Sequence, residues 1–245
     1  MYLFLCNLSI IDMCYTTANI PKLLYILLSG NNSISFTQCF IQMYFIFMSG
    51  ITENTLIFIM AYDRCVAICH PLYYHLILNK KICLLLMMVS WMSGCLNSSL
   101  LTSSILKMIF CSSLTIHQFF CDAKALINIA CVGTDMFYII MYIEFLLFGL
   151  CPVMCNLMTY LKIIRVILHI KSKDSRGKAF STCSSHLTVM AIYYGSGASV
   201  YMIPPSDLYE QILTIFYTTV VPVLNPLIYS LRNKDFKNSL WKLLS

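Results

Sequence analysis

Apolar stretches of about 20 residues or more recur along the chain, and they limit its fold more than any other feature. An α-helix needs about 20 apolar residues to cross the roughly 30 Å hydrocarbon core of a bilayer. Charged residues make up 11% of the chain, against about 25% in soluble domains. Membrane β-strands would alternate apolar and polar residues over segments of about 10, and no such alternation is visible. The sequence therefore predicts an all-α membrane protein.

The apolar runs and the turn residues between them predict a single bundle domain over residues 1–245. Its six spans are expected at residues 1–28, 36–64, 82–104, 136–165, 180–203 and 208–230. Residues 233–244 combine apolar side chains with lysines, which predicts a short helix along the membrane surface. No cleavable signal is expected, because residues 1–28 lack a basic start and a small-residue cleavage site.

The lysines and arginines near the span ends predict the orientation of the bundle. Nearly all of them fall on one side, and only Lys22, Lys107 and Lys124 fall on the other. Basic loops stay in the cytosol, so both chain ends should lie inside. This topology explains the net charge of +6 without a nucleic-acid partner. The first outer loop then carries the sequon Asn31-Asn32-Ser33, which makes Asn31 the expected glycosylation site.

Four of the thirteen cysteines should lie on the outer side, namely Cys39, Cys111, Cys121 and Cys131. Four cysteines allow three pairings, and an oxidising exterior favours disulfides. A metal site is the alternative, because His117 and Cys121 are four residues apart on the same loop.

Two carboxylates, Asp12 and Glu53, lie within the first two predicted spans, and three prolines lie within the fourth and sixth. Asp12 and Glu53 must face inward, because a charge at the bilayer centre costs at least about 2.5–3.5 kcal/mol. Facing carboxylates would share a proton or hold a cation between them, whereas the other reading is a neutral pair that helps packing. Each of the prolines Pro152, Pro222 and Pro226 removes a backbone hydrogen bond and favours a kink.

Three strings carry a resemblance to a known family: MAYDRCVAICHPLYY at 60–74, KAFSTCSSHL at 178–187 and NPLIYSLRNKDF at 225–236. They closely resemble the odorant receptors, which are rhodopsin-like G-protein-coupled receptors. HQFFCD at 117–122 is similar to the tetrapod-type branch, and the likeness covers essentially the whole chain. The resemblance implies a plasma-membrane protein with a rhodopsin-like seven-helix bundle. Since the chain starts where the family's second span starts, the first helix is expected to be missing, which leaves six spans.

The resemblance also implies a mechanism. Arg64 matches the family's Asp-Arg arginine, which Asp63 holds at rest and which reaches a stimulatory heterotrimeric G protein when a helix swings outward. Cys65 stands where the family usually has Tyr. The switch positions carried over are Asp63, Arg64, Tyr160, Asn225, Pro226 and Tyr229.

The expected ligand is a small volatile odorant held in the outer half of the bundle. The matching positions are Ile46, Phe47, Gly50, Ile51, Glu144, Leu147, Phe148, Tyr194, Gly197, Ala198, Tyr201 and Thr218. An ionisable group at the depth of Glu144 is a functional candidate, and the alternative is a protonated carboxyl that faces another helix. The resemblance further implies the disulfides Cys39–Cys121 and Cys111–Cys131, and a sodium ion between Asp12 and Glu53 at rest. No other cofactor is required.

Enzymatic activity is not expected. Ser181, Cys183 and His186 look like a catalytic group, but they lie at the cytosolic start of a span within a receptor motif. Two other functions remain open. A non-signalling truncated remnant is one, and an ion-coupled transporter is the other, because proton and cation pathways also use intramembrane carboxylates such as Asp12 and Glu53. The two halves of the chain share no visible repeat that would support a transporter.

Overall fold

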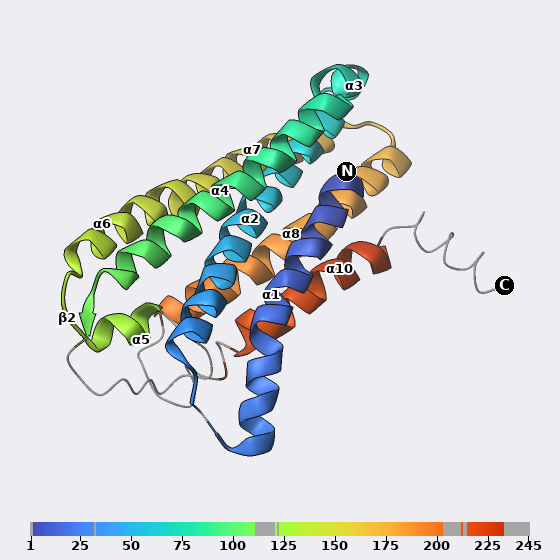
Figure 1. Ribbon diagram of the computed structural model, residues 1–245. Coiled ribbons are helices and arrows are strands. Elements are labelled where there is room, and N and C mark those ends of the chain that lie inside the picture. The colour runs from blue at the N-terminus through green and yellow to red at the C-terminus, as the bar shows by residue number, and fades with distance from the viewer. Residues whose placement is uncertain are drawn as a thin grey trace.

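The computed structural model describes residues 2–31, 33–110, 121, 123–202, 212 and 215–232. Within these residues the chain is mostly helical, and its long helices lie side by side in one bundle (Figure 1). The long elements are α1 (Tyr2–Ser29), α2 (Phe36–Cys69), α4 (Lys80–Leu106), α6 (Asp135–Glu144), α7 (Cys151–His169), α8 (Lys173–Met202) and α10 (Val221–Arg232). Short helices η1 (Pro71–Tyr73) and α3 (Tyr74–Ile77) follow α2 at the predicted cytosolic end.

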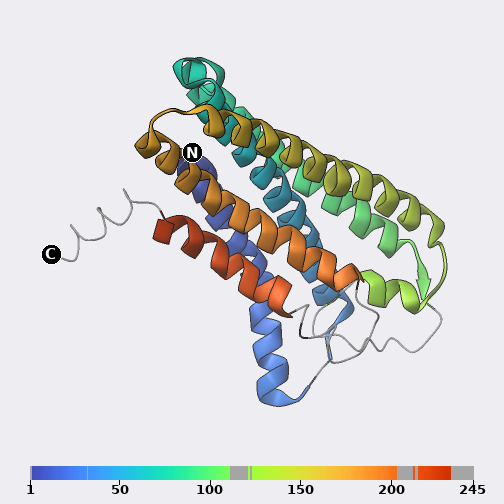
Figure 2. The same cartoon turned by 180° about the vertical axis from the view of Figure 1, so that it is seen from behind.

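Within the described part of the chain, four helical stretches are long and apolar enough to cross a membrane: Leu3–Ser29, Phe36–Cys69, Lys80–Leu106 and Asp135–His169. They coincide with the first four predicted spans. The last two predicted spans correspond in part to α8 and α10, and α10 packs against both α1 and α8 in the same bundle (Figure 2). The helix α8 is not among these four stretches, because its serine, glycine, tyrosine and charged residues lower its mean hydropathy.

The helices extend past most of the predicted span boundaries. The helix α2 continues to Cys69, beyond the predicted end at residue 64, and α8 begins at Lys173 instead of residue 180. The predicted boundaries lie near charged residues, whereas the backbone hydrogen bonds of a helix continue past them. Capping fixes two of the starts, since Ser35 and Gln38 form a capping box on α2 and the Asn79 side chain accepts from the Ile82 N–H on α4.

Two wide helical turns each end just before a proline. The π-helix η2 (Phe145–Leu150) leads into α7 and Pro152, and the π-helix η3 (Phe216–Val220) leads into α10 and Pro222. A proline breaks the regular hydrogen-bond ladder, and single π turns are a common local result. The bundle also contains a proline inside α1, Pro21, which was not among the three prolines predicted to favour kinks.

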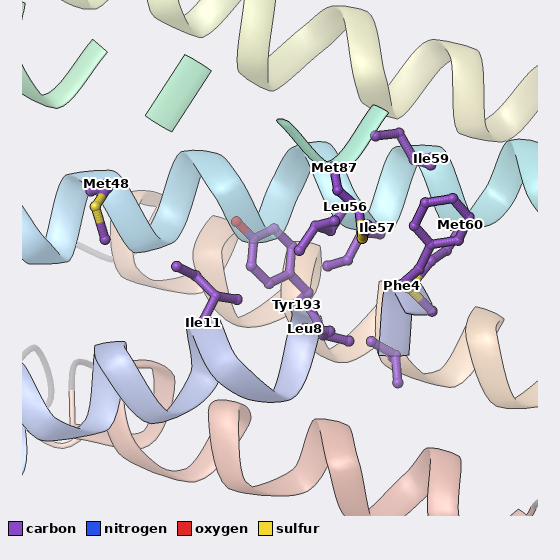
Figure 3. Packing of buried hydrophobic residues seen from close by; sticks show 11 residues of the cluster. Phe4, Leu8, Ile11, Met48, Leu56, Ile57, Ile59, Met60, Met87 and Tyr193 are labelled. Atoms are coloured by element: carbon purple, nitrogen blue, oxygen red, sulfur yellow. The ribbon is translucent and has the colours of Figure 1, made fainter. Parts of the chain in front are cut away.

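The core forms where α1 and α8 pack on α2. Phe4, Leu8 and Ile11 of α1 lie against Leu56, Ile57 and Met60 of α2, and Tyr193 enters from α8 (Figure 3). On its other side α2 approaches α4 closely at Gly94, where an added Cβ would lie 2.7 Å from the Met48 carbonyl oxygen. The helix α2 therefore lies at the centre of the bundle and positions side chains toward several neighbours.

The outer end contains structure that an all-α prediction misses. Strands β1 (Ile109–Phe110) and β2 (Ala130–Val132) pair antiparallel, and a short helix, α5 (Ala123–Asn128), precedes β2. A disulfide joins Cys39 at the start of α2 to Cys121, with their Cα atoms 5.1 Å apart, so the predicted pairing is confirmed. Cys131 is also disulfide-bonded, whereas its expected partner Cys111 lies outside the described residues, as do His117 and the predicted helix at 233–244.

Candidate functional site: a polar chain through a helical bundle

The predicted cytosolic end of α2 carries Asp63 and Arg64, whose side chains are 2% and 9% exposed. The Tyr74 hydroxyl, on α3, donates to Asp63 Oδ1 at 2.8 Å. Burial and this hydrogen bond raise the pKa of Tyr74 above its usual range. The carboxylate is thus tied to the short helix that follows α2, a contact that the sequence did not predict.

Tyr160 and His186 meet inside the bundle near Arg64. The Tyr160 hydroxyl lies 2.6 Å from His186 Nδ1, and their rings stack with centroids 5.8 Å apart. His186 Nε2 lies 3.2 Å from the Ile57 carbonyl oxygen. A carbonyl only accepts, so Nε2 carries a proton, and in a neutral imidazole Nδ1 then accepts from Tyr160. The charge of Arg64 acts on both side chains.

The two intramembrane carboxylates also meet, as expected, and an amide bridges them. Asn225 Nδ2, from α10, donates to Glu53 Oε1 at 2.7 Å and to Asp12 Oδ1 at 3.3 Å. Asp12 Oδ2 and Asn225 Oδ1 are buried without a hydrogen-bond partner, and so is the Ser49 hydroxyl one turn before Glu53. Oxygen atoms of this kind fit a hard cation. Among the described residues no group of three or more His, Cys, Asp or Glu side chains could hold a metal, so a cation here would need the amide and hydroxyl oxygens as ligands.

Several of the candidate ligand residues come from α2 and α8, which contact each other. The Tyr193 hydroxyl donates to the Gly50 carbonyl oxygen at 3.0 Å, which joins α8 to α2. The Tyr193 ring contacts the rings of Tyr194 and Tyr217. A Cβ added at Gly197 would lie 3.8 Å from the Tyr217 ring. Tyr193 and Tyr217 thus belong to the same aromatic group as the predicted Tyr194.

Glu144 faces Asn97 of α4. The Glu144 Oε1 and Asn97 Nδ2 atoms are buried, and neither makes a hydrogen bond of good geometry. The structure therefore brings the carboxyl beside another helix, while one of its oxygens is still available to a donor.

The other predicted ligand residues are spread over several environments. Thr218 is buried, Ile46, Phe47, Ile51 and Phe148 are half-buried, and Leu147 and Ala198 are exposed. The side chains of Tyr201, Pro226 and Tyr229 lie outside the described part of the chain. A groove of about 370 Å³ lies between α2 and α4, lined by Phe36, Phe40, Tyr44 and Thr102 among others. It contains none of the predicted ligand residues.

Sequence reasoning missed several polar residues that connect helices: Gln42, Asn54, Tyr74, Asn156 and Tyr193. All but Tyr74 lie within the apolar helices, and a polar side chain in a span needs a partner inside the bundle. That signal is present in the sequence alone for Gln42, Asn54 and Asn156. It does not identify their partners, because several of these are backbone carbonyls, which carry no sequence signature.

The chain is similar over its whole length to known proteins. A family model described as "Olfactory receptor" matches residues 1–245. The chain is 43% identical to human Olfactory receptor 2K2 over 247 residues, which covers 100% of the chain and 78% of that protein. It is 42% identical to the dog Olfactory receptor-like protein OLF4 over 243 residues, with 98% and 79% covered. It is also 41% identical to human Olfactory receptor 8D1 over 247 residues, with 100% and 80% covered.

Proposed function

The chain belongs to the olfactory receptor family, whose members are non-enzymatic receptors, and on that premise we propose that it binds small volatile molecules and activates a stimulatory heterotrimeric G protein. Ligand binding would occur in the outer half of the bundle, and the G protein would contact the cytosolic end. The receptor would act at the plasma membrane. No bond is made or broken, so the mechanism is a shift between conformations for which the ligand has different affinities.

The arrangement around Arg64 supports the G-protein proposal most strongly. A buried arginine at the end of a span lies beside a hydrogen-bonded pair, Tyr160 and His186, that joins two other helices. Outward movement of α8 would separate His186 from the Ile57 carbonyl of α2 and open the space next to Arg64. A change in the position of α8 would thereby alter what a cytosolic partner can reach.

The aromatic group formed by Tyr193, Tyr194 and Tyr217 supports the ligand proposal. Small-molecule sites are mostly apolar with a few well-placed polar groups. Here tyrosine rings from α8 and η3 contact one another, and the Tyr193 hydroxyl bonds to the Gly50 carbonyl of α2. Glu144 would add a carboxyl for an amine-bearing odorant.

We also propose that Asp12 and Glu53 hold a sodium ion in the resting receptor. Support comes from the unpartnered oxygens of Asp12, Asn225 and Ser49, which supply the ligand type that a hard cation prefers. Bound sodium would stabilise the resting arrangement of α1, α2 and α10, since all three helices contribute to this cluster.

The proposed function is tested by expressing the chain in cells with a stimulatory G protein and measuring cAMP against an odorant panel. Arg64→Ala, at equal surface labelling, serves as the matched control. An odorant response that disappears with Arg64→Ala is the expected result. Surface-labelled protein that gives no Arg64-dependent response to any odorant would reject signalling and favour a non-signalling remnant. Ion flux through liposomes that contain the purified chain would instead favour a transporter.

A further inference from the structure

The helix that runs through η2 and α7 has a break in its ladder of backbone hydrogen bonds at Pro152. Proline has no backbone N–H, so the carbonyl four residues earlier, that of Phe148, lacks its usual α-helical donor. In a bilayer no water replaces that donor, and an unsatisfied carbonyl in hydrocarbon is strongly unfavourable. Something else in the bundle has to satisfy the Phe148 carbonyl.

Asn54 of α2 supplies the missing donor. Its Nδ2 atom donates to the Phe148 carbonyl oxygen. Its Oδ1 atom accepts a hydrogen bond of 2.9 Å from the Tyr194 hydroxyl on α8. The Asn54 side chain is 5% exposed, so both bonds lie in the interior, where no water competes for them.

The chain of hydrogen bonds then returns to the helix where it began. Asn156 of α7 donates from Nδ2 to the Tyr194 hydroxyl oxygen at 3.2 Å. Phe148 lies four residues before Pro152 and Asn156 four residues after it. The bonds thus run from one side of the break, through α2 and α8, to the other side.

We propose that Asn54 and Tyr194 form a clamp that fixes the helix break at Pro152, and that Asn54 is the positioning residue in it. The clamp holds the two halves of the broken helix at a set angle, because one half is bonded to Asn54, the other is bonded to Tyr194, and these two side chains are bonded to each other. The Asn54 side chain donates through Nδ2 and accepts through Oδ1. A residue that replaces it therefore needs both a donor and an acceptor to form the same two bonds.

The clamp also connects the candidate ligand site to α2 and α7, through the hydroxyl of Tyr194. This part of the inference rests on the proposed function. Tyr194 and Phe148 are both candidate ligand residues, and Tyr194 contributes a bond to each arm of the clamp. A ligand that moves the Tyr194 hydroxyl breaks its bonds to Asn54 and Asn156 together. The angle at Pro152 is then free to change, and with it the position of Tyr160 further along α7.

A double-mutant cycle on the purified full chain tests the clamp without any signalling assay. Asn54→Leu keeps the side-chain volume and removes both bonds, so the melting temperature should fall by several degrees. Pro152→Ala returns a backbone N–H that can donate to the Phe148 carbonyl. In that background Asn54→Leu should lower the melting temperature by less than half as much, because the carbonyl no longer depends on Asn54.

Thr55→Val is the matched control in the same cycle. Its hydroxyl lies next to Asn54 in the sequence and donates to the Ile51 carbonyl within α2. The effects of Thr55→Val and Pro152→Ala should therefore add. If Asn54→Leu and Pro152→Ala also add, the residue only fills space and the clamp is rejected.

The signalling part has a separate readout. Tyr194→Phe removes the shared hydroxyl and retains the ring, and it should raise ligand-independent cAMP at least twofold at equal surface labelling. Asn54→Leu should do the same, and the two substitutions together should not exceed the larger single effect. Coupled melting temperatures with unchanged cAMP would retain the clamp and overturn its role in signalling. A chain without any odorant response would reject the proposed function and leave the melting-temperature test intact.

Discussion

The hydroxyl of Tyr160 lies 2.6 Å from Nδ1 of His186, which joins α7 to α8 beside Arg64. Because His186 also contacts the Ile57 carbonyl, one imidazole connects three helices. His186, which the sequence places in a group that looks catalytic, therefore lies in the middle of α8 and connects helices. Its removal should change the equilibrium between conformations.

His186→Leu should raise ligand-independent cAMP, since it removes one hydrogen bond from α8 to α7 and one from α8 to α2. The measurement is cAMP in cells without odorant, normalised to surface labelling. His169→Leu is the control, because that histidine is exposed and bonds only within its own helix, to the Arg165 carbonyl. Unchanged or lower basal cAMP for His186→Leu would contradict this role.

Glu144→Gln should weaken the response to amine odorants and leave neutral odorants unaffected. The substitution preserves the shape that faces Asn97 and removes the carboxyl that would pair with an ammonium group. Dose–response curves for one active amine and one active neutral odorant provide the comparison. An identical amine curve would eliminate Glu144 as the recognising group.

Sodium should lower agonist potency about fivefold or more when it replaces choline in the medium. Asp12→Asn should abolish that dependence, because it removes a charge from the oxygen cluster and leaves the Asn225 bridge in place. Asp135→Asn, at the exposed start of α6, is the matched control and should respond like the parent chain. Sodium dependence that survives Asp12→Asn would rule out this site.

Gln42→Leu should loosen the outer loop around the disulfide. Gln42 Oε1 accepts from the Cys121 N–H at 3.0 Å, and Nε2 donates to the Ala18 carbonyl oxygen at 3.0 Å. Leaving the buried Cys121 N–H without a partner costs about 1–3 kcal/mol. The Cys39–Cys121 bond should then be reduced faster by dithiothreitol, as measured by thiol labelling. Gln42→Glu retains the acceptor and should show a smaller increase, and equal rates for both variants and the parent would refute the contact.

Gly94→Ala should destabilise the packing of α2 against α4. The new methyl group would lie 2.7 Å from the Met48 carbonyl oxygen, so one helix must shift, and overpacking of this kind costs about 1–3 kcal/mol. Thermal unfolding in detergent should show a lower melting temperature. Gly177→Ala has open space around it and should be neutral or slightly stabilising, and the same loss at both positions would argue against a steric cause.

Much of the architecture could be predicted from the sequence. The long apolar runs predicted membrane-spanning helices, and four of those helices coincide with predicted spans. The Asp12–Glu53 meeting was predicted as well, since two carboxylates in hydrocarbon have to face inward. Helix ends were predicted less well, because charged residues do not end a helix: α2 continues past Asp63 and Arg64 to Cys69, and α8 begins in a charged stretch at Lys173.

The amino-acid sequence by itself determined the class of this protein and its family, and through the family the pairing of Cys39 with Cys121, because hydropathy and motif strings are local properties of the chain. Only the tertiary structure decided which polar groups bond to one another. Asn54 bonds to a carbonyl left open by Pro152, and Gln42 bonds to the N–H of Cys121. Those partners are backbone atoms far away along the chain, and only the packing of helices in space brings them within reach.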